Sequence, residues 1–530
     1  MSLVVDKHVP VTMRDGTVLA ADVYRPEGAE PRSTVLIRTP YSKDDPAHAN
    51  TWINVLRAAE SGWAVVVQDV RGRFRSGGTF VPFAHEADDG TDTIAWVREQ
   101  PWSDGHVGMV GGSYVGITQW LAATRAPKGL LGIVPGSTAD DVTTGWTHEE
   151  QNLTFGFLAH WVSVLAASSK DLTPEDRARA AALVQGVTDG SCRTFDDLIK
   201  AAGDLAPYLP DWRDRSGEIV DPEAAGRVRL PVLVISGWFD IFGPGSVASY
   251  TRRDAAGTRQ PHDRLLVGPW AHGVMGGWFP GHTYGPAASF DALDPTGLQL
   301  GWFETLRDGG PAPADPVTAF VMGANEWRSF STWPPQEARP VEVPLRVDGS
   351  PHALVSAEPV PTIGGRTFFP GYKVAANAGP RPQGPLSERD DVVALVSDPL
   401  PEDTDVLGGI TCTLAVASDA PTAVVVKLST TNQDGESVLL AEGSSRTTAS
   451  ARQGETVSVD LGPTAVRLDR GTRLSLTVAA SDFPRLEDGP RAGFSVLERA
   501  PSSDFPRLED GPRAGFSVLE RAPALHLDVV

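Results

Sequence analysis

The sequence predicts a chain with an α/β domain built on a parallel sheet, a helical segment inserted into that domain, and a C-terminal all-β sandwich. Three observations predict this class. Apolar strand-like runs alternate with helical patterns up to about residue 340, which indicates parallel strands joined by helices. Helix-rich sequence interrupts the alternation over residues 140–222. Beyond residue 340, short strand-like segments are separated by Gly, Pro, Asn and Asp, as is typical of a sandwich or jelly roll. We therefore assign residues 1–139 and 223–340 to the α/β domain, 140–222 to the insertion and 341–530 to the sandwich.

The N-terminal elements follow from local patterns. Two short alternating runs meet at Asp15-Gly16, a strong hairpin signal. The apolar runs 33–38 and 64–67 are predicted strands, and residues 52–59 between them have helical spacing. The loop that follows, residues 68–78, is rich in Arg and Gly but lacks the residue order of a phosphate-binding loop. We expect a structural connection whose arginines pair with nearby carboxylates.

The sequence Gly111-Gly112-Ser113-Tyr114-Val115-Gly116 lies between the apolar run 107–110 and a helical pattern over 117–123. A strand, a glycine-dense turn with one serine, and a helix together predict a nucleophile elbow, which exposes the serine hydroxyl above the sheet. Glycines suit this turn because they adopt strained backbone conformations at little cost and leave room where strand and helix approach. The G-x-S-x-G pattern is shifted here, since its last glycine is Gly116. The alternative is an ordinary glycine-rich turn.

Two further residues with catalytic chemistry follow predicted strands. Asp240 comes shortly after the apolar run 230–235, and His272 shortly after the run 264–267. An isolated Asp or His in a loop is usually a turn residue. Here, however, Ser113, Asp240 and His272 occur in the chain order of the α/β-hydrolase fold, each near the carboxyl end of a strand. We predict that they form a catalytic triad in an α/β-hydrolase domain, with the helical insertion as a cap.

The cap sequence carries several large aromatic residues, including Trp146, Phe155, Phe157 and Trp161. They could be core residues or an apolar wall for substrate. Within the cap, Thr173 followed by Pro174 predicts a helix start.

Near the C-terminus, residues 481–501 recur without change as residues 503–523. Two identical copies do not make a repeat architecture, which needs three or more. We expect only one copy to fill the loop between the predicted strands 474–479 and 525–529, with the other as an irregular surface excursion.

Composition excludes several classes of partner. The formal net charge of −21 argues against nucleic acid and anionic membranes. The sequence shows neither a signal peptide nor an apolar run long enough to span a bilayer, so we expect a cytoplasmic location. Cys192 and Cys412 are expected to be free thiols, and the scattered histidines indicate no metal site. We expect no cofactor and leave a homodimer open.

Motifs along nearly the whole chain resemble one family of serine hydrolases, which includes bacterial cocaine esterase, the X-prolyl dipeptidyl peptidases and the α-amino-acid ester hydrolases. The resemblance rests on Met13-Arg14-Asp15-Gly16, Arg38-Thr39-Pro40-Tyr41, Asp69-Val70-Arg71-Gly72, the elbow with Tyr114 after Ser113, Gly237-Trp238-Phe239-Asp240, Gly268-Pro269-Trp270-Ala271-His272 and Ser481-Asp482-Phe483-Pro484-Arg485. It implies a hydrolase domain with a helical cap and a C-terminal jelly roll. It also implies that the Tyr41 hydroxyl joins the backbone N–H of Tyr114 in the oxyanion hole, and that Trp146 and Trp161 line the acyl pocket. We add Trp238 and Phe239, next to Asp240, as expected substrate-binding residues.

The expected activity is hydrolysis of a small-molecule ester or short acyl substrate with a bulky or aromatic acyl group. One alternative is an X-prolyl dipeptidyl peptidase, or an α-amino-acyl ester hydrolase or β-lactam side-chain acylase. These would need carboxylates to bind a substrate ammonium group, and Glu149, Glu150 and Asp141 in or near the cap are candidates. A third reading is a non-catalytic binding protein with a hydrolase fold.

Overall fold

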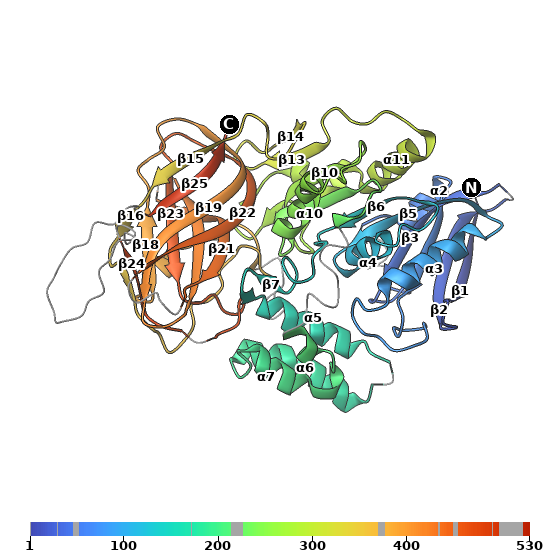
Figure 1. The fold of residues 1–530 in the computed structure, drawn as a ribbon, viewed down its shortest axis with the longest axis horizontal. Helices are drawn as coiled ribbons and strands as arrows, with labels where there is room; N and C mark the ends of the chain where they lie inside the picture. The colour runs from blue at the N-terminus through green and yellow to red at the C-terminus, as the bar shows by residue number, and fades with distance from the viewer. Residues whose placement is uncertain are drawn as a thin grey trace.

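The computed structural model describes residues 2–28, 30–45, 52–170, 172–213, 226–368, 377–432, 435–448, 454–489, 491–497 and 523–530. A sheet flanked by helices, a group of cap helices and a β-sandwich lie around a common junction (Figure 1). The chain is therefore an α/β-hydrolase fold with an all-β C-terminal domain.

The hydrolase sheet is mixed, with a parallel centre and antiparallel edges. Its strands, in spatial order, are β1 (Leu3–Thr12), β2 (Val18–Pro26), β4 (Ala64–Asp69), β3 (Arg32–Thr39), β5 (Ser103–Gly112), β6 (Leu130–Gly136), β9 (Leu233–Phe239), β10 (Arg264–Ala271), β13 (Val317–Val321) and β14 (Glu326–Phe330). Strands β4 to β13 run parallel, whereas β1, β2 and β14 pair antiparallel. Every residue of β4 and β9 is buried, as expected for strands covered on both faces.

Helices cover both faces of this sheet. They are α2 (Val55–Glu60), α3 (Glu86–Arg98), α4 (Tyr114–Ala123), α10 (Gly243–Ala255) and α11 (Pro295–Asp308). Ile94 of α3 and Trp120 of α4 belong to one hydrophobic core, while Ala58 of α2 and Trp302 of α11 belong to a second one. Two separate cores on the two faces fix the sheet between layers, so its central strands cannot shift without unpacking a helix.

The cap contains the hairpin β7 (His148–Glu149) and β8 (Asn152–Leu153), followed by α5 (Phe155–Ala167), α6 (Pro174–Asp189), α7 (Phe195–Ala202) and η1 (Gly203–Leu205). The Thr173 side chain accepts a hydrogen bond from the backbone N–H of Asp176 and begins α6 as the sequence predicts. Gly190, with φ of 75°, ends that helix in the left-handed region. Figure 1 shows α5 between the hydrolase sheet and the outer helices α6 and α7, so α5 is the cap element nearest the active site.

Two antiparallel sheets form the C-terminal sandwich. One contains β15 (Arg339–Pro344), β25 (Ala524–Val529), β19 (Thr404–Ser418), β24 (Phe494–Leu497) and β17 (His352–Ala353), with β22 (Glu455–Leu468) paired to β19. The other contains β16 (Arg346–Asp348), β18 (Val392–Val396), β23 (Arg473–Ala479), β20 (Ala423–Thr431) and β21 (Ser437–Arg446). The short helix α13 (Gly384–Ser387), the hairpin β11 (Trp278–Phe279) and β12 (His282–Thr283), η2 (Pro286–Ala288) and η3 (Phe290–Leu293) complete the described elements.

The first copy of the duplicated segment connects the sandwich to the cap. Its Arg485 is buried and pairs with Asp482 of the same copy, with Glu149 of the cap hairpin and, at 3.7 Å, with Glu442 of β21. The same copy supplies β24, which pairs with β19. The second copy lies outside the described residues except for Pro523.

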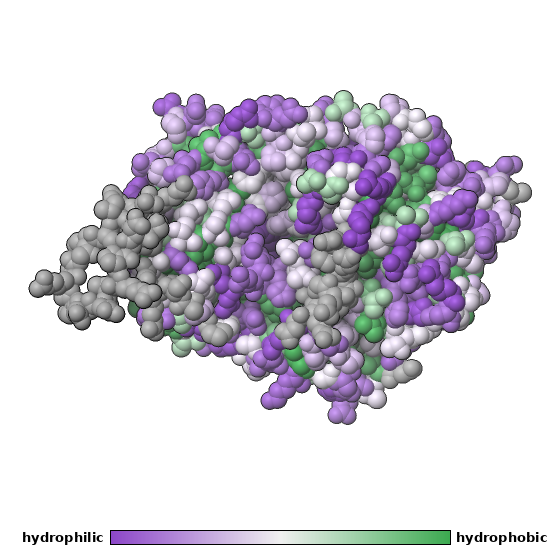
Figure 2. Space-filling view, viewed as in Figure 1, coloured by the Kyte–Doolittle hydropathy of each residue, from purple (hydrophilic) through white to green (hydrophobic). Residues whose placement is uncertain are grey.

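The face of the molecule drawn in Figure 2 is largely hydrophilic, and its hydrophobic side chains form scattered groups. This agrees with the formal net charge of −21. Among the residues that the structure describes, no helix combines the length and the apolar character needed to cross a bilayer.

Candidate active site

Ser113 stands at a sharp strand-to-helix turn. It follows the last residue of β5 and precedes the first residue of α4, with φ of 58° and ψ of −131°. A non-glycine residue in this region costs about 1–3 kcal/mol, and such strain is typical of functional sites. The Ser113 N–H donates to the Gly136 carbonyl at 2.9 Å, so the neighbouring strand β6 holds the turn in place.

The glycines of the elbow are required by close packing. A Cβ on Gly112 would lie 2.0 Å from the Trp52 ring, and one on Gly116 would lie 2.5 Å from Thr138. A side chain fits at position 115, because Val115 occupies the space that Gly111 leaves free by having no Cβ. The shifted glycine therefore marks where α4 meets Thr138.

Asp240 and His272 form a hydrogen-bonded pair at the carboxyl ends of β9 and β10. His272 Nδ1 lies 3.1 Å from Asp240 Oδ2 and 3.2 Å from Oδ1. Asp240 is fully buried and also accepts a hydrogen bond of 2.8 Å from the Phe242 N–H. Such a carboxylate fixes the orientation of the imidazole and stabilises its protonated form during catalysis.

Ser113, Asp240 and His272 lie at the same edge of the sheet because β5, β6, β9 and β10 are consecutive strands. Their carboxyl ends meet at one edge, where ligands bind in open α/β sheets. Ser113 and His272 line the same cavity there.

Tyr41, just beyond β3, lies within hydrogen-bonding distance of the nucleophile. Its hydroxyl accepts a hydrogen bond of 2.9 Å from Trp161 Nε1 and is hydrogen-bonded to the Ser113 side chain. Burial raises the pKa of Tyr41 to about 12, so the phenol keeps its proton at neutral pH. Tyr114 is the first residue of α4, and N–H groups of a first helical turn have no intrahelical acceptor. Its own hydroxyl points elsewhere, donating to Glu86.

Arg73 holds the segment before Tyr41 and corrects one expectation for the loop 68–78. Arg71 and Arg75 of that loop do pair with carboxylates. The buried guanidinium of Arg73 instead donates to the carbonyls of Pro40 and Leu165, each at 3.0 Å. Burial lowers the pKa of Arg73. Because Leu165 belongs to α5, this side chain ties the cap to the backbone that carries Tyr41.

The cavity above Ser113 has a volume of about 430 Å³ and mostly apolar walls. Its lining includes Tyr41, Trp52, Gly112, Ser113, Val115, Ser137, Phe157, His160, Trp161, Val164, His272, Gly273, Met275 and Phe368. Hydrolase domain, cap and sandwich all contribute, since Trp161 comes from α5 and Phe368 from the C-terminal domain. Such a volume and lining suit a small organic ligand.

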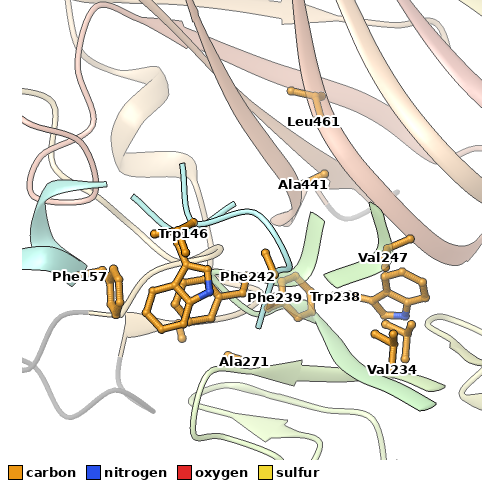
Figure 3. Close-up of a cluster of buried hydrophobic side chains, with 14 of the residues drawn as sticks. Trp146, Phe157, Val234, Trp238, Phe239, Phe242, Val247, Ala271, Ala441 and Leu461 are labelled. Atoms are coloured by element: carbon orange, nitrogen blue, oxygen red, sulfur yellow. The ribbon is translucent and has the colours of Figure 1, made fainter. Parts of the chain in front are cut away.

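The structure separates the four aromatic residues expected to bind substrate. Trp161 lines the cavity. Trp146 is buried behind that wall, with its ring stacked on Phe242 at 4.3 Å. Trp238 donates from Nε1 to the Phe320 carbonyl, and Figure 3 shows it beside Val234 and Val247, at the opposite end of the cluster from Phe157. Phe239 is buried next to Phe279 and Tyr284. Only Trp161 of the four lines the cavity. Trp146 is covered by the cap aromatic residues and Phe242, and β9 places Trp238 and Phe239 beneath packed elements that local sequence does not reveal.

Sequence reasoning did not identify four other lining residues as ligand-contacting: Trp52, His160, Met275 and Phe368. Trp52 could have been found through the glycines that accommodate its ring, since Gly112 and Gly136 both face it. Phe368 carried no signal, because nothing in the sequence indicates which part of the sandwich reaches the hydrolase domain.

The three carboxylates considered for ammonium binding are not among the described residues that line this cavity. Glu149 pairs with Arg485, and Glu149 and Glu150 line a second cavity of about 170 Å³ at the junction with the sandwich. Asp141 accepts a hydrogen bond from the backbone N–H of Thr143. The described residues that line the catalytic cavity include no carboxylate.

One group of described residues has the composition of a metal site. Ligand atoms of His8, Asp22 and Asp44 lie within 4.8 Å of one another. The ammonium group of Lys43, however, lies 2.8 Å from Asp22 and 3.2 Å from Asp44, and Lys7 pairs with the same two carboxylates. These ammonium groups already compensate the carboxylates, so the group is explained as an ion-pair network in which Asp22 and Lys43 are buried and Lys7 and Asp44 are exposed.

Comparisons with known proteins agree with the fold. The family model described as X-Pro dipeptidyl-peptidase (S15 family) matches residues 15–274, and that of the X-Pro dipeptidyl-peptidase C-terminal non-catalytic domain matches residues 312–494. Cocaine esterase from Rhodococcus sp. (strain MB1 Bresler) is 31% identical over 92% of this chain and 93% of its own length.

Solved structures share the fold at lower identity. An aminopeptidase from a marine sediment Thaumarchaeota archaeon superimposes with a TM-score of 0.78 at 18% identity, covering 99% of this chain and 96% of that one. An α-amino acid ester hydrolase gives a TM-score of 0.75 at 21% identity, covering 100% and 97% of the two chains. These two structures establish the fold and not the substrate.

Proposed function

Since the chain belongs to the S15 family of serine hydrolases, which includes cocaine esterase, we propose that it cleaves carboxylic esters with bulky or aromatic acyl groups through an acyl-enzyme intermediate. The observation that carries this proposal is the catalytic cavity. Ser113, Tyr41 and the Asp240-bonded His272 meet there, within apolar walls that include no carboxylate among the described lining residues.

In the proposed mechanism, His272 removes the proton from the Ser113 hydroxyl as its oxygen attacks the ester carbonyl carbon. The carbonyl oxygen becomes an oxyanion, to which the Tyr41 hydroxyl and the Tyr114 N–H donate hydrogen bonds. The bond to the leaving oxygen then breaks, and protonated His272 delivers its proton to the departing alcohol. Water, deprotonated by His272, releases the acid from the acyl-enzyme.

The apolar cavity walls also indicate which class of substrate the protein prefers. Trp52, Phe157 and Trp161 supply aromatic surface to an uncharged acyl group. An X-prolyl dipeptidyl peptidase remains the second candidate because the family model is described by that activity. That activity requires binding of a substrate ammonium group, and Glu149, Glu150 and Asp141 are not among the described residues that line the cavity.

A hydrolysis panel tests the choice between these activities. We expect kcat/KM to be highest for an aryl ester such as 4-nitrophenyl benzoate, above a glycyl-prolyl anilide and an α-amino ester such as phenylglycine methyl ester. A preference for the anilide would instead support the dipeptidyl peptidase. A fluorophosphonate probe should label the wild type and not Ser113→Ala, whereas an unlabelled wild type would support a non-catalytic binding protein.

The cytoplasmic location and a homodimer stay predictions from the sequence. Cell fractionation and light scattering would test them.

A further inference from the structure

One face of helix α5 forms the cap side of the catalytic cavity. Phe157, His160, Trp161 and Val164 all line the cavity, at the i, i+3, i+4, i+7 spacing of a single helical stripe. Phe157, Trp161 and Val164 present aliphatic or aromatic surface to the cavity. His160 is different because its ring carries two nitrogen atoms that can form hydrogen bonds.

Those nitrogens have no hydrogen-bond partner among the described residues, although the side chain is largely buried. The N–H of the adjacent Trp161 is already committed to Tyr41. Burial, together with the nearby His272, lowers the pKa of His160 to about 4, so its imidazole is neutral at pH 7. A neutral imidazole offers one donor and one acceptor. A ligand that displaced water from this imidazole without supplying a partner would leave the group unpaired, which costs free energy, whereas a ligand with a polar atom at this place would not.

The position of His160 relative to His272 indicates which half of the substrate it would meet. The Phe368 ring lies edge-on to His272, with centroids 5.0 Å apart, and 5.1 Å from the His160 ring. Both imidazoles therefore border the wall that Phe368 forms. In the proposed mechanism His272 protonates the leaving oxygen, so the leaving alcohol lies next to His272 and extends along Phe368 toward His160. The Tyr41–Trp161 pair marks the oxyanion side instead.

We propose that His160 is a specificity-determining residue, which hydrogen-bonds a neutral polar group, such as an ether, hydroxyl or carbonyl oxygen, on the leaving alcohol of the substrate. This inference rests on the proposed esterase function. According to this inference, the alcohol part of the substrate carries a polar atom several bonds away from the ester oxygen. The rest of the alcohol lies against apolar side chains.

Matched esters test the assignment. Cyclohexylmethyl benzoate and (tetrahydropyran-4-yl)methyl benzoate differ in the alcohol by one ring CH₂ replaced by an ether oxygen. The ratio of their kcat/KM values, ether over carbocycle, should fall about fivefold in His160→Phe relative to wild type, as expected for loss of one hydrogen bond. His160→Gln, which keeps a donor and an acceptor, should retain most of the ratio. Val164→Ala on the same stripe should change both substrates alike.

A second pair places the same change in the acyl half, as methyl cyclohexanecarboxylate and methyl tetrahydropyran-4-carboxylate. Its ratio should be the same in His160→Phe and wild type. An unchanged ratio for the alcohol pair, or a change confined to the acyl pair, would overturn the proposal.

If neither ester is hydrolysed, that failure counts against the proposed esterase function. Binding measurements then still test the role of His160. With Ser113→Ala as background, calorimetry should show that adding His160→Phe weakens the ether-containing ester about fivefold more than the carbocyclic one. Equal weakening of both would refute the role of His160.

Discussion

Replacement of Tyr41 by Phe removes one hydroxyl group from the proposed oxyanion hole and leaves the ring in place. In the structure this hydroxyl is held by Trp161 Nε1 at 2.9 Å and is hydrogen-bonded to Ser113. Its pKa, raised by burial to about 12, keeps it a donor throughout the neutral range. The perturbation therefore removes a pre-oriented donor at the position where negative charge develops.

The expected loss follows from the strength of such donors. Removing one oxyanion-hole donor costs about 3 kcal/mol of transition-state stabilisation, or roughly a hundredfold in kcat. KM should change much less, since the hydrogen bond strengthens only as the oxyanion forms. Stability should fall by about 1–3 kcal/mol, because the Trp161 N–H loses its acceptor.

Steady-state hydrolysis of 4-nitrophenyl benzoate measures kcat and KM, and thermal unfolding measures stability. Tyr24→Phe is the matched control, because Tyr24 is a partly buried residue of β2 outside the cavity lining. It should leave kcat unchanged. If Tyr41→Phe kept the wild-type kcat, or raised KM alone, Tyr41 would have no part in oxyanion stabilisation.

Three other predictions follow from packing, buried charge and protonation. Gly112→Ala brings a Cβ to 2.0 Å from the Trp52 ring, so overpacking should lower the free energy of unfolding by about 1–3 kcal/mol; an unchanged melting temperature would mean that Trp52 moves freely. Arg485→Met removes one of the two cations, the other being Lys427, that pair with the buried carboxylates of Asp482 and Glu442, and it should destabilise the protein by about 3–5 kcal/mol in urea unfolding. Arg507→Met, at the same position of the second copy, should have no effect, and an equal loss would contradict the expectation that one copy fills the loop. His160 has a folded pKa of about 4, below its ordinary value of 6.5, so the unfolded chain binds the proton first as the pH falls. Stability should therefore be lost between pH 6.5 and 4, and His160→Gln should reduce that loss of stability by about 2 kcal/mol, measured as a shallower fall in melting temperature; parallel curves would refute the lowered pKa.

Local patterns in the sequence were enough to predict much of the fold and the order of the proposed triad. The strand predicted over residues 474–479 is part of β23, and the hairpin at Asp15-Gly16 joins β1 to β2. Ser113, Asp240 and His272 could be proposed together because each follows a strand, and parallel strands end at one edge of a sheet. These features depend on hydrophobic periodicity and turn chemistry, which short segments encode by themselves.

Only the tertiary structure decided which side chains form the cavity walls. Trp161 and Trp238 look equally suitable in the sequence, yet Trp161 lines the cavity, whereas Trp238 of β9 is buried and donates from Nε1 to the Phe320 carbonyl of β13. Phe368 and His160 meet across two domains that are far apart along the chain. Whether an aromatic residue is core or pocket depends on the elements packed against it, and those long-range contacts leave no periodic trace in the sequence around the residue.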